Sequence, residues 1–218
     1  LFIFASKDFF KVVNVKVEGE NELIKSDITE KILYIKNKEN LIYLNTKKME
    51  KYLEEDVRIK NIEIKKVYPS ELIDKIEENK PYSYLRQGNN FYIINDEGKI
   101  FAYIDEVSNK NLPIIDAADK DDLEDILQVL SNIKNENFFS NISEIRKVKS
   151  DYEILLNDGT LIKTSIVVNH TKYENCFKLY QSLINENKKV EYIHLRFKDI
   201  NLKEKDLSQT NLEGKDGR

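Results

Sequence analysis

The stretch YPSELIDKIEENKPYSYL, residues 68–85, marks both a reversal of the chain and a change of module. Its first three residues predict a turn, because proline fixes φ at a value that suits the second position of a turn. The ELIDKIEE segment that follows is predicted as the returning strand. The proline in Lys80-Pro81 ends that strand, since it has no N–H for a sheet hydrogen bond. We therefore expect one module to end near residue 80 and a second to begin at Pro81.

The residues before this stretch follow a pattern of strand, two helices and strand. KVVNVKVEG alternates valine with polar residues, which predicts the first strand. Two amphipathic helices are predicted next, SDITEKILYI with Ser26 as N-cap and NTKKMEKYLEEDV. RIKNIEIKKV then predicts a strand that directs Ile62, Ile64 and Val67 inward. With the returning strand, the order is β-α-α-β-β over residues 11–78.

The second module mixes short strands with two amphipathic helices. Strands are predicted in YSYL, NFYIIN, KIFAYI, ISEIRKVK, YEILL and LIKTSIVV. Hairpin turns are predicted at NDEG (95–98) and NDGT (157–160), where glycine can adopt a positive φ. The helices are predicted in DKDDLEDILQVLSNI and TKYENCFKLYQSLINENK, each with apolar residues on one face.

The last predicted strand is EYIHLRFKDI, residues 191–200. Its apolar residues alternate with aromatic and basic ones, which is the period of a half-buried strand. The inward set is Ile193, Leu195 and Phe197, and the outward set is Tyr192, His194, Arg196 and Lys198. A terminal strand is free to be a sheet edge, whose basic residues either protect it from aggregation or accept a partner strand.

Composition limits the classes of function. The 218 residues include 35 lysines and arginines against 39 aspartates and glutamates, a formal net charge of -4. This balance argues against a general nucleic-acid binder, which would show a basic excess. The one cysteine, Cys176, excludes an internal disulfide and a cysteine-based metal cluster.

The sequence also lacks the motifs of the common enzyme classes. It contains no glycine-rich phosphate loop, no HExxH zinc motif and no GxSxG nucleophile motif. His194 is interpreted as a surface residue and His170 as a turn or helix-cap residue. Cys176 lies on the apolar face of a predicted helix and is interpreted as an inert core thiol. We therefore expect a binding module without catalytic residues, metal or cofactor.

The structure of the two ends of the chain is predicted from their amino-acid composition alone. Residues 1–10, LFIFASKDFF, are compatible with the stub of a membrane helix, with a first strand or with a disordered start. No complete transmembrane segment or signal peptide is predicted. From about Leu202 onward the residues are polar, and a disordered tail is predicted over residues 204–218.

Six segments, taken in order, resemble the extracytoplasmic part of the bacterial cell-division proteins FtsQ and DivIB. They are FKVVNVKVEGENEL, YPSELIDKIEENKPYSYL, NDEGKIF, LPII, LLNDGT and EYIHLRF. The resemblance implies an α+β fold, with a β-α-α-β-β POTRA domain over residues 11–80. A β-rich domain with a mixed or antiparallel sheet and two helices would follow over residues 81–203. The chain departs from the family at Asn79, which stands near a frequent arginine, and at His194 and Lys198, which replace an aspartate and a proline.

The resemblance implies a non-enzymatic scaffold of the division machinery. The family is anchored in the cytoplasmic membrane by one helix, which would precede Leu1, with both domains on the extracytoplasmic side at the division septum. Its β domain is expected to bind FtsB (DivIC in Gram-positive bacteria), which pairs with FtsL in a coiled coil, by strand addition to the last strand. The partner-binding residues implied are Tyr192, His194, Leu195, Arg196, Phe197 and Lys198.

The sequence is also compatible with other functions. A different POTRA-type protein would chaperone or dock exported polypeptides during secretion or outer-membrane assembly. A hydrolase would use an unrecognised site around His170 or His194. Within the first module, an edge strand around Glu71–Glu77 would accept another strand, or the module would serve as a rigid spacer.

Overall fold

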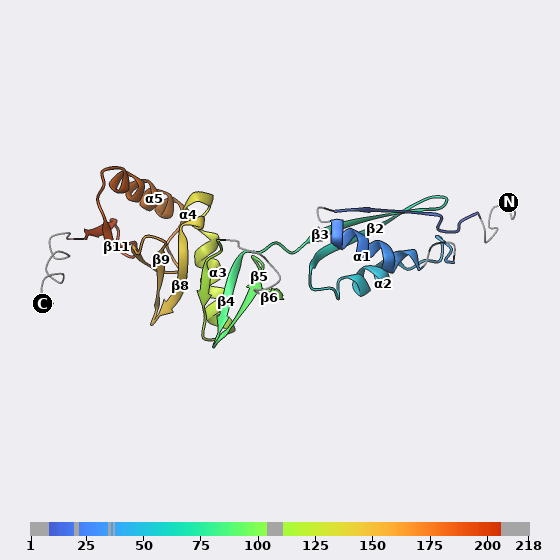
Figure 1. Cartoon of the computed structure of the whole chain (residues 1–218), viewed down its shortest axis with the longest axis horizontal. Coiled ribbons are helices and arrows are strands. Elements are labelled where there is room, and N and C mark those ends of the chain that lie inside the picture. Colours follow the sequence, from blue (N-terminus) through green and yellow to red (C-terminus); the bar gives the residue numbers. More distant parts are fainter. Residues whose placement is uncertain (1–8, 20–21, 35, 37, 104–110, 206–218) are drawn as a thin grey trace, which may run out of the picture. The chain divides into compact units, whose positions relative to one another are not determined.

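The computed structural model describes residues 9–19, 22–34, 36, 38–103 and 111–205 (Figure 1). The chain forms two compact units that divide between Lys80 and Pro81. The predicted membrane-proximal stub lies outside the described residues except for Phe9 and Phe10. Each unit is described by itself below.

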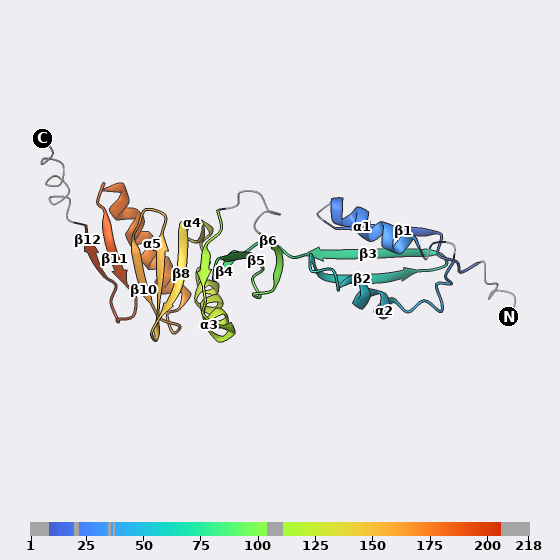
Figure 2. The ribbon, with the colours of Figure 1, turned by 60° about the horizontal axis from the view of Figure 1, so that its bottom comes forward.

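Unit 1 is a three-stranded sheet with two helices. Its elements are β1 (Asn14–Glu18), α1 (Glu22–Leu33), α2 (Thr46–Leu53), β2 (Ile59–Val67) and β3 (Glu71–Glu78). The sheet order is β1-β3-β2, with β1 parallel and β2 antiparallel to β3. Figure 2 shows β2 and β3 as a long antiparallel pair. Helix α1 packs on β1 and α2 on β2, and the core lies between the helices and the sheet.

Three local predictions for unit 1 are wrong. Strand β3 is the central strand rather than an edge, because it pairs with β1 in parallel on one side and with β2 on the other. Helix α1 begins at Glu22, so Ser26 lies within the helix and is not its N-cap. Val67 is exposed, because a strand that points Ile62 and Ile64 inward turns the odd-numbered residues outward.

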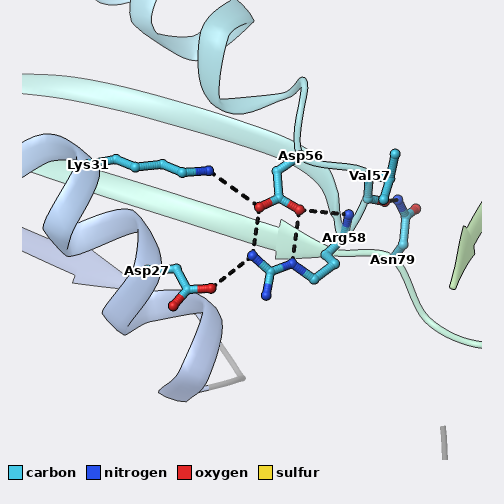
Figure 3. Close-up of polar contacts among 6 residues, drawn as sticks. All are labelled: Asp27, Lys31, Asp56, Val57, Arg58 and Asn79. Atoms are coloured by element: carbon cyan, nitrogen blue, oxygen red, sulfur yellow. Dashed lines mark hydrogen bonds and ion pairs between the residues drawn. The ribbon is translucent and has the colours of Figure 1, made fainter. Parts of the chain in front are cut away.

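A polar cluster joins α1, the α2–β2 loop and the end of β3 (Figure 3). The Arg58 guanidinium donates to Asp56 at 2.7 Å and to Asp27 at 2.9 Å. The hydrogen bonds from Arg58 hold the pKa of Asp56 well below its usual range. Asn79 donates its side-chain amide to the Val57 carbonyl at 2.7 Å, and its N–H to the Arg58 carbonyl at 2.8 Å. The hydrogen bonds of Asn79 thus connect the end of β3 to the start of β2.

Unit 2 is a nine-stranded mixed sheet with order β12-β11-β10-β9-β8-β7-β4-β5-β6. The pairs β4–β7, β7–β8 and β10–β11 are parallel and the others antiparallel. The strands are β4 (Ser83–Gln87), β5 (Asn90–Ile94), β6 (Ile100–Tyr103), β7 (Ile114–Asp116), β8 (Ile142–Val148), β9 (Asp151–Leu156), β10 (Leu161–Thr164), β11 (Val190–His194) and β12 (Asn201–Glu204). The predicted α+β fold, with a small β-α-α-β-β unit and a β-rich unit, is confirmed.

Helices connect two of the three parallel pairs of unit 2, β7–β8 and β10–β11, since parallel neighbours need a long crossover connection. Helices α3 (Lys120–Ser131) and α4 (Glu136–Ser140) lie between β7 and β8, and α5 (His170–Asn185) lies between β10 and β11. Asp119 and Asn169 cap α3 and α5 through their side-chain oxygens. The short α4 was not predicted, although its Phe138 is a buried core residue that stacks on Phe177 with ring centroids 4.9 Å apart.

The β5–β6 hairpin contains a glycine whose replacement tests the packing of α3. Gly98 has φ of +80°, and a Cβ added there would lie 2.9 Å from Leu127 Cδ1. Gly98→Ala is therefore expected to destabilise unit 2 by about 1–3 kcal/mol, mainly from backbone strain and in part from the shift that the new Cβ imposes on Leu127. Gly88→Ala is the matched control, because its φ is +61° but the added Cβ meets open space. Urea midpoints that fall equally in both variants would contradict the packing argument.

Candidate partner-binding surface

Strand β12 forms one end of the nine-stranded sheet, and Figure 2 shows it as the outermost strand of unit 2. Among the described residues, no strand pairs with its other side. The strand predicted over residues 191–200 therefore differs from the observed β11 in two ways. Strand β11 ends at His194, and it lies between β10 and β12 rather than at the edge of the sheet. Strand β12 also includes Glu204, the first residue of the tail predicted as disordered, while residues 206–218 lie outside the described part of the chain.

The backbone of β11 is satisfied on both sides. The Leu195 N–H donates to the Lys163 carbonyl at 2.8 Å, so this side of β11 faces β10. On its other side, β11 places Tyr192 and His194 opposite Lys203 and Asn201 of β12. Strand addition directly to β11 would have to displace β12.

The six predicted binding residues lie together where β11 turns into β12. Tyr192 and His194 are half-buried in β11, and Leu195 is fully buried just after it. The remaining three, Arg196, Phe197 and Lys198, are exposed in the turn toward β12.

Three rings form a row on the outward face of this corner. The Tyr192 and His194 ring centroids lie 5.1 Å apart, and His194 stacks on Phe197 with centroids 5.8 Å apart. Phe197 is 51% exposed, which corrects the prediction that it points inward with Ile193 and Leu195. The reason is that the regular alternation stops where β11 ends at His194.

Basic side chains surround the row of rings. Lys163 and Lys203 lie 5.7 and 6.0 Å from the Tyr192 ring centroid, within cation–π range. Arg196 forms an ion pair with Asp151, and Lys172 of α5 donates to the Phe197 carbonyl. The turn is thus tied to both α5 and the β8–β9 hairpin. Lys163 and Lys203 were missed from the sequence, because only the strand pairing brings them to Tyr192.

His194 occupies an environment that favours the neutral imidazole. Its Nδ1 is buried without a hydrogen-bond partner. Burial lowers the pKa of His194, and the positive charges of Lys163 and Arg196 lower it further. An imidazole in this setting serves as part of the aromatic row. It lacks the carboxylate or carbonyl partner on Nδ1 that orients the base of a catalytic triad.

The free side of β12 offers backbone groups to another chain. The Lys205 N–H donates to the Lys189 carbonyl at 2.7 Å, so odd-numbered residues of this strand direct their backbone toward β11. By the two-residue alternation, Leu202 and Glu204 direct their N–H and C=O groups away from the sheet. Beyond this end of β12 lies a hollow of about 400 Å³ lined in part by Lys188, Lys189 and Lys205.

Comparisons with known proteins agree with this architecture. The family model "Cell division protein FtsQ/DivIB, C-terminal" matches residues 83–196, and "POTRA domain, FtsQ-type" matches residues 10–79. Cell division protein DivIB of Clostridium tetani is 30% identical over 152 residues, which cover 68% of this chain and 56% of that protein. DivIB of Staphylococcus aureus is 24% identical over 181 residues, covering 81% of this chain and 41% of that protein.

Among solved structures, the major extracytoplasmic domain of DivIB from Geobacillus stearothermophilus matches with a TM-score of 0.38 and 15% sequence identity. The match covers 50% of this chain and 97% of that domain. The chain spans about half the length of the curated relatives it matches. No helix within the described residues is both long and apolar enough to cross a membrane. The resemblance drawn from the six sequence segments is confirmed by the family models.

Proposed function

The chain belongs to the FtsQ/DivIB family of cell-division proteins, and from this premise we propose that it is a non-enzymatic scaffold of the division machinery. Its partner in this proposal is a coiled-coil pair of the FtsB/DivIC and FtsL type. The partner adds a strand to the free side of β12. Unit 2 carries this docking surface, and a helix preceding Leu1 holds both units on the extracytoplasmic side of the cytoplasmic membrane at the septum.

The free side of β12 is the observation that carries the proposal. Strand addition needs a row of unpaired backbone groups, and β12 supplies those of Leu202 and Glu204. Most of the side chains in the strand are polar and exposed, with a glutamate and a lysine in the last two positions. A partner strand would find both a hydrogen-bonding edge and charges that set its direction.

The corner formed by Arg196, Phe197 and Lys198 lies next to this edge and would hold partner side chains. Phe197 offers an exposed ring whose position is fixed by His194 on one side and by the Lys172 contact with its carbonyl on the other. Lys198, which is exposed in this corner, favours a partner segment that carries carboxylates. Strand addition would supply affinity through the backbone, and this corner would select the partner through side chains.

Glu204→Pro tests the docking edge directly. Proline removes the outward N–H of residue 204 and leaves the bonds to β11 in place, since the residue 204 N–H does not face that strand. Calorimetric affinity for a soluble DivIC/FtsL-type pair from the same organism is expected to fall about tenfold or more.

Glu204→Ala is the control for this experiment, because both variants lose the ion pair of Glu204 with Lys188, which measures 3.4 Å. The alanine variant keeps the N–H and is expected to bind within about twofold of the parent, since exposed ion pairs contribute little. Circular dichroism checks that both variants fold. Equal affinities of the two variants would place the partner elsewhere.

A further inference from the structure

Eight of the ten exposed large apolar side chains of unit 1 lie at one end of the unit. The ten are Phe9, Val13, Leu33, Tyr34, Ile42, Tyr43, Tyr52, Val57, Val67 and Tyr68, and all of them except Tyr52 and Val57 belong to this end. We call these eight residues the aromatic end. A soluble surface rarely gathers so many exposed apolar groups without a binding role.

Backbone and ring contacts hold the three segments of the aromatic end together. The Leu41 N–H donates to the Phe10 carbonyl at 2.7 Å, and the Val12 N–H donates to the Glu39 carbonyl at 3.1 Å. Phe10 packs edge-on against Tyr68 with ring centroids 6.1 Å apart. The entering chain, the α1–α2 loop and the β2–β3 turn therefore form one continuous surface.

The same surface is basic, although the whole chain is acidic. Segments 9–13, 33–43 and 66–70 contain four lysines, namely Lys11, Lys36, Lys38 and Lys66, and one glutamate. Lys38 Nζ lies 3.9 Å from the Tyr34 ring centroid, and Lys66 Nζ reaches the Ile42 carbonyl at 3.4 Å. The positive charges of Lys38 and Lys66 therefore lie directly beside the exposed Tyr34 and Ile42.

We propose that the aromatic end of unit 1 binds the surface of an anionic phospholipid membrane. Tyrosine and phenylalanine side chains would enter the headgroup region, and the lysines would contact lipid phosphates. The position of the surface fits this occupant, because the chain enters unit 1 here, a few residues after the apolar Leu1–Ala5. Strand β3 leads away from this end, from Ser70 toward Asn79. The proposal uses no residue of the β12 surface and goes beyond the partner-binding function.

Two tyrosines of similar exposure provide a matched test. Tyr43 is 78% exposed within the aromatic end, whereas Tyr52 is 61% exposed on α2 and outside it. We would measure flotation of the full chain with vesicles of phosphatidylglycerol and phosphatidylcholine in equal parts, and with phosphatidylcholine alone. Tyr43→Ser is expected to lower the partition coefficient about fivefold on the mixed vesicles, and Tyr52→Ser is expected to leave it unchanged.

A second pair of variants tests the charge. Lys36→Gln with Lys38→Gln is expected to lower the partition coefficient about twenty-five-fold at low ionic strength, since each lysine contributes about fivefold. Lys134→Gln with Lys178→Gln removes two exposed lysines of unit 2 and is expected to have no effect. All variants keep residues 1–8, so any contribution of the apolar start is common to them.

Three results would overturn the proposal. The first is a parent chain that does not float with the mixed vesicles. The second is equal binding by the Tyr43→Ser and Tyr52→Ser variants. The third is a Tyr43→Ser change that alters only self-association in sedimentation, which would assign the surface to a second copy of the chain. Failure at β12 would leave this test unaffected, since the two surfaces share no residue.

Discussion

Asp74→Asn is expected to abolish most of a pH-dependent loss of stability in unit 1, which amounts to as much as about 4 kcal/mol. Asp74 lies on the central strand β3, is fully buried, and neither of its carboxyl oxygens has a hydrogen-bond partner. Burial raises the pKa of Asp74 to about 7, and the negative charge of Glu50 on α2 adds to the increase. The difference between this pKa and the usual aspartate pKa of 3.8 corresponds to about 4 kcal/mol in the free energy of unfolding.

The sign of the effect follows from proton binding. Below about pH 4, Asp74 is protonated in both the folded and the unfolded chain, and burial of its charge costs nothing. Between about pH 4 and 7 the unfolded chain loses this proton while the folded chain keeps it, so stability falls as pH rises. Above about pH 7 the folded chain carries the buried charge and the full cost remains.

The measurement is hydrogen exchange of core amides in unit 1, such as those of Ile62 and Leu72, on the full chain at several pH values. In the parent, the free energy of opening is expected to fall between about pH 4 and 8, and in Asp74→Asn this trend should be nearly flat. Above pH 7 the variant is expected to be more stable than the parent, because it has no buried charge. The buried amide of the asparagine, itself without a partner, reduces this difference in stability by about 1–3 kcal/mol. Asp56→Asn serves as control, because the pKa of Asp56 is lowered and its removal leaves the trend above pH 4 intact. Parallel profiles for the parent and Asp74→Asn would refute the argument.

Phe197→Asp is expected to weaken binding of the DivIC/FtsL-type pair about thirtyfold, if the corner beside β12 holds the partner as proposed. The ring is half exposed and fixed by stacking on His194, which are the properties of an interface anchor residue. An aspartate would remove the apolar contact and repel an acidic partner segment. Calorimetry of the full chain gives the affinity, and circular dichroism confirms folding.

The matched control for Phe197 lies at the opposite end of the same sheet. Ile100 of β6 is 39% exposed, and Ile100→Asp introduces the same charge far from β12. Its affinity is expected to equal that of the parent. If Phe197→Asp also retained full affinity while Glu204→Pro lost it, binding would depend on the backbone edge alone.

The fold class was predictable because its signals are local. Period-two alternation marks most of the strands, and an amphipathic pattern with acidic residues in the first turn marks α3. The buried state of Cys176 was predicted in the same way, from its position on the apolar face of α5, and is confirmed.

The errors arose where pairing between distant segments decides the outcome. The sequence Asn-Leu-Lys-Glu at 201–204 is short and contains one apolar residue, so only its pairing with β11 makes it a strand. The central place of β3 likewise depends on β1, more than fifty residues earlier in the sequence. Asp74 did leave a signal that was missed, since alternation places it on the same face as Leu72 and Ile76.

Because of the position of β12, the docking edge forms only when the rest of unit 2 has folded. Strand β11 reaches β10 only after the chain has passed through the whole of α5, and β12 is in turn supported by β11 alone. Contacts that close long segments of chain form late, because their entropic cost must be met first. A chain in which α5 had not yet docked would therefore lack the β12 edge, and a partner recruited by strand addition to β12 would select fully folded molecules over partly folded ones.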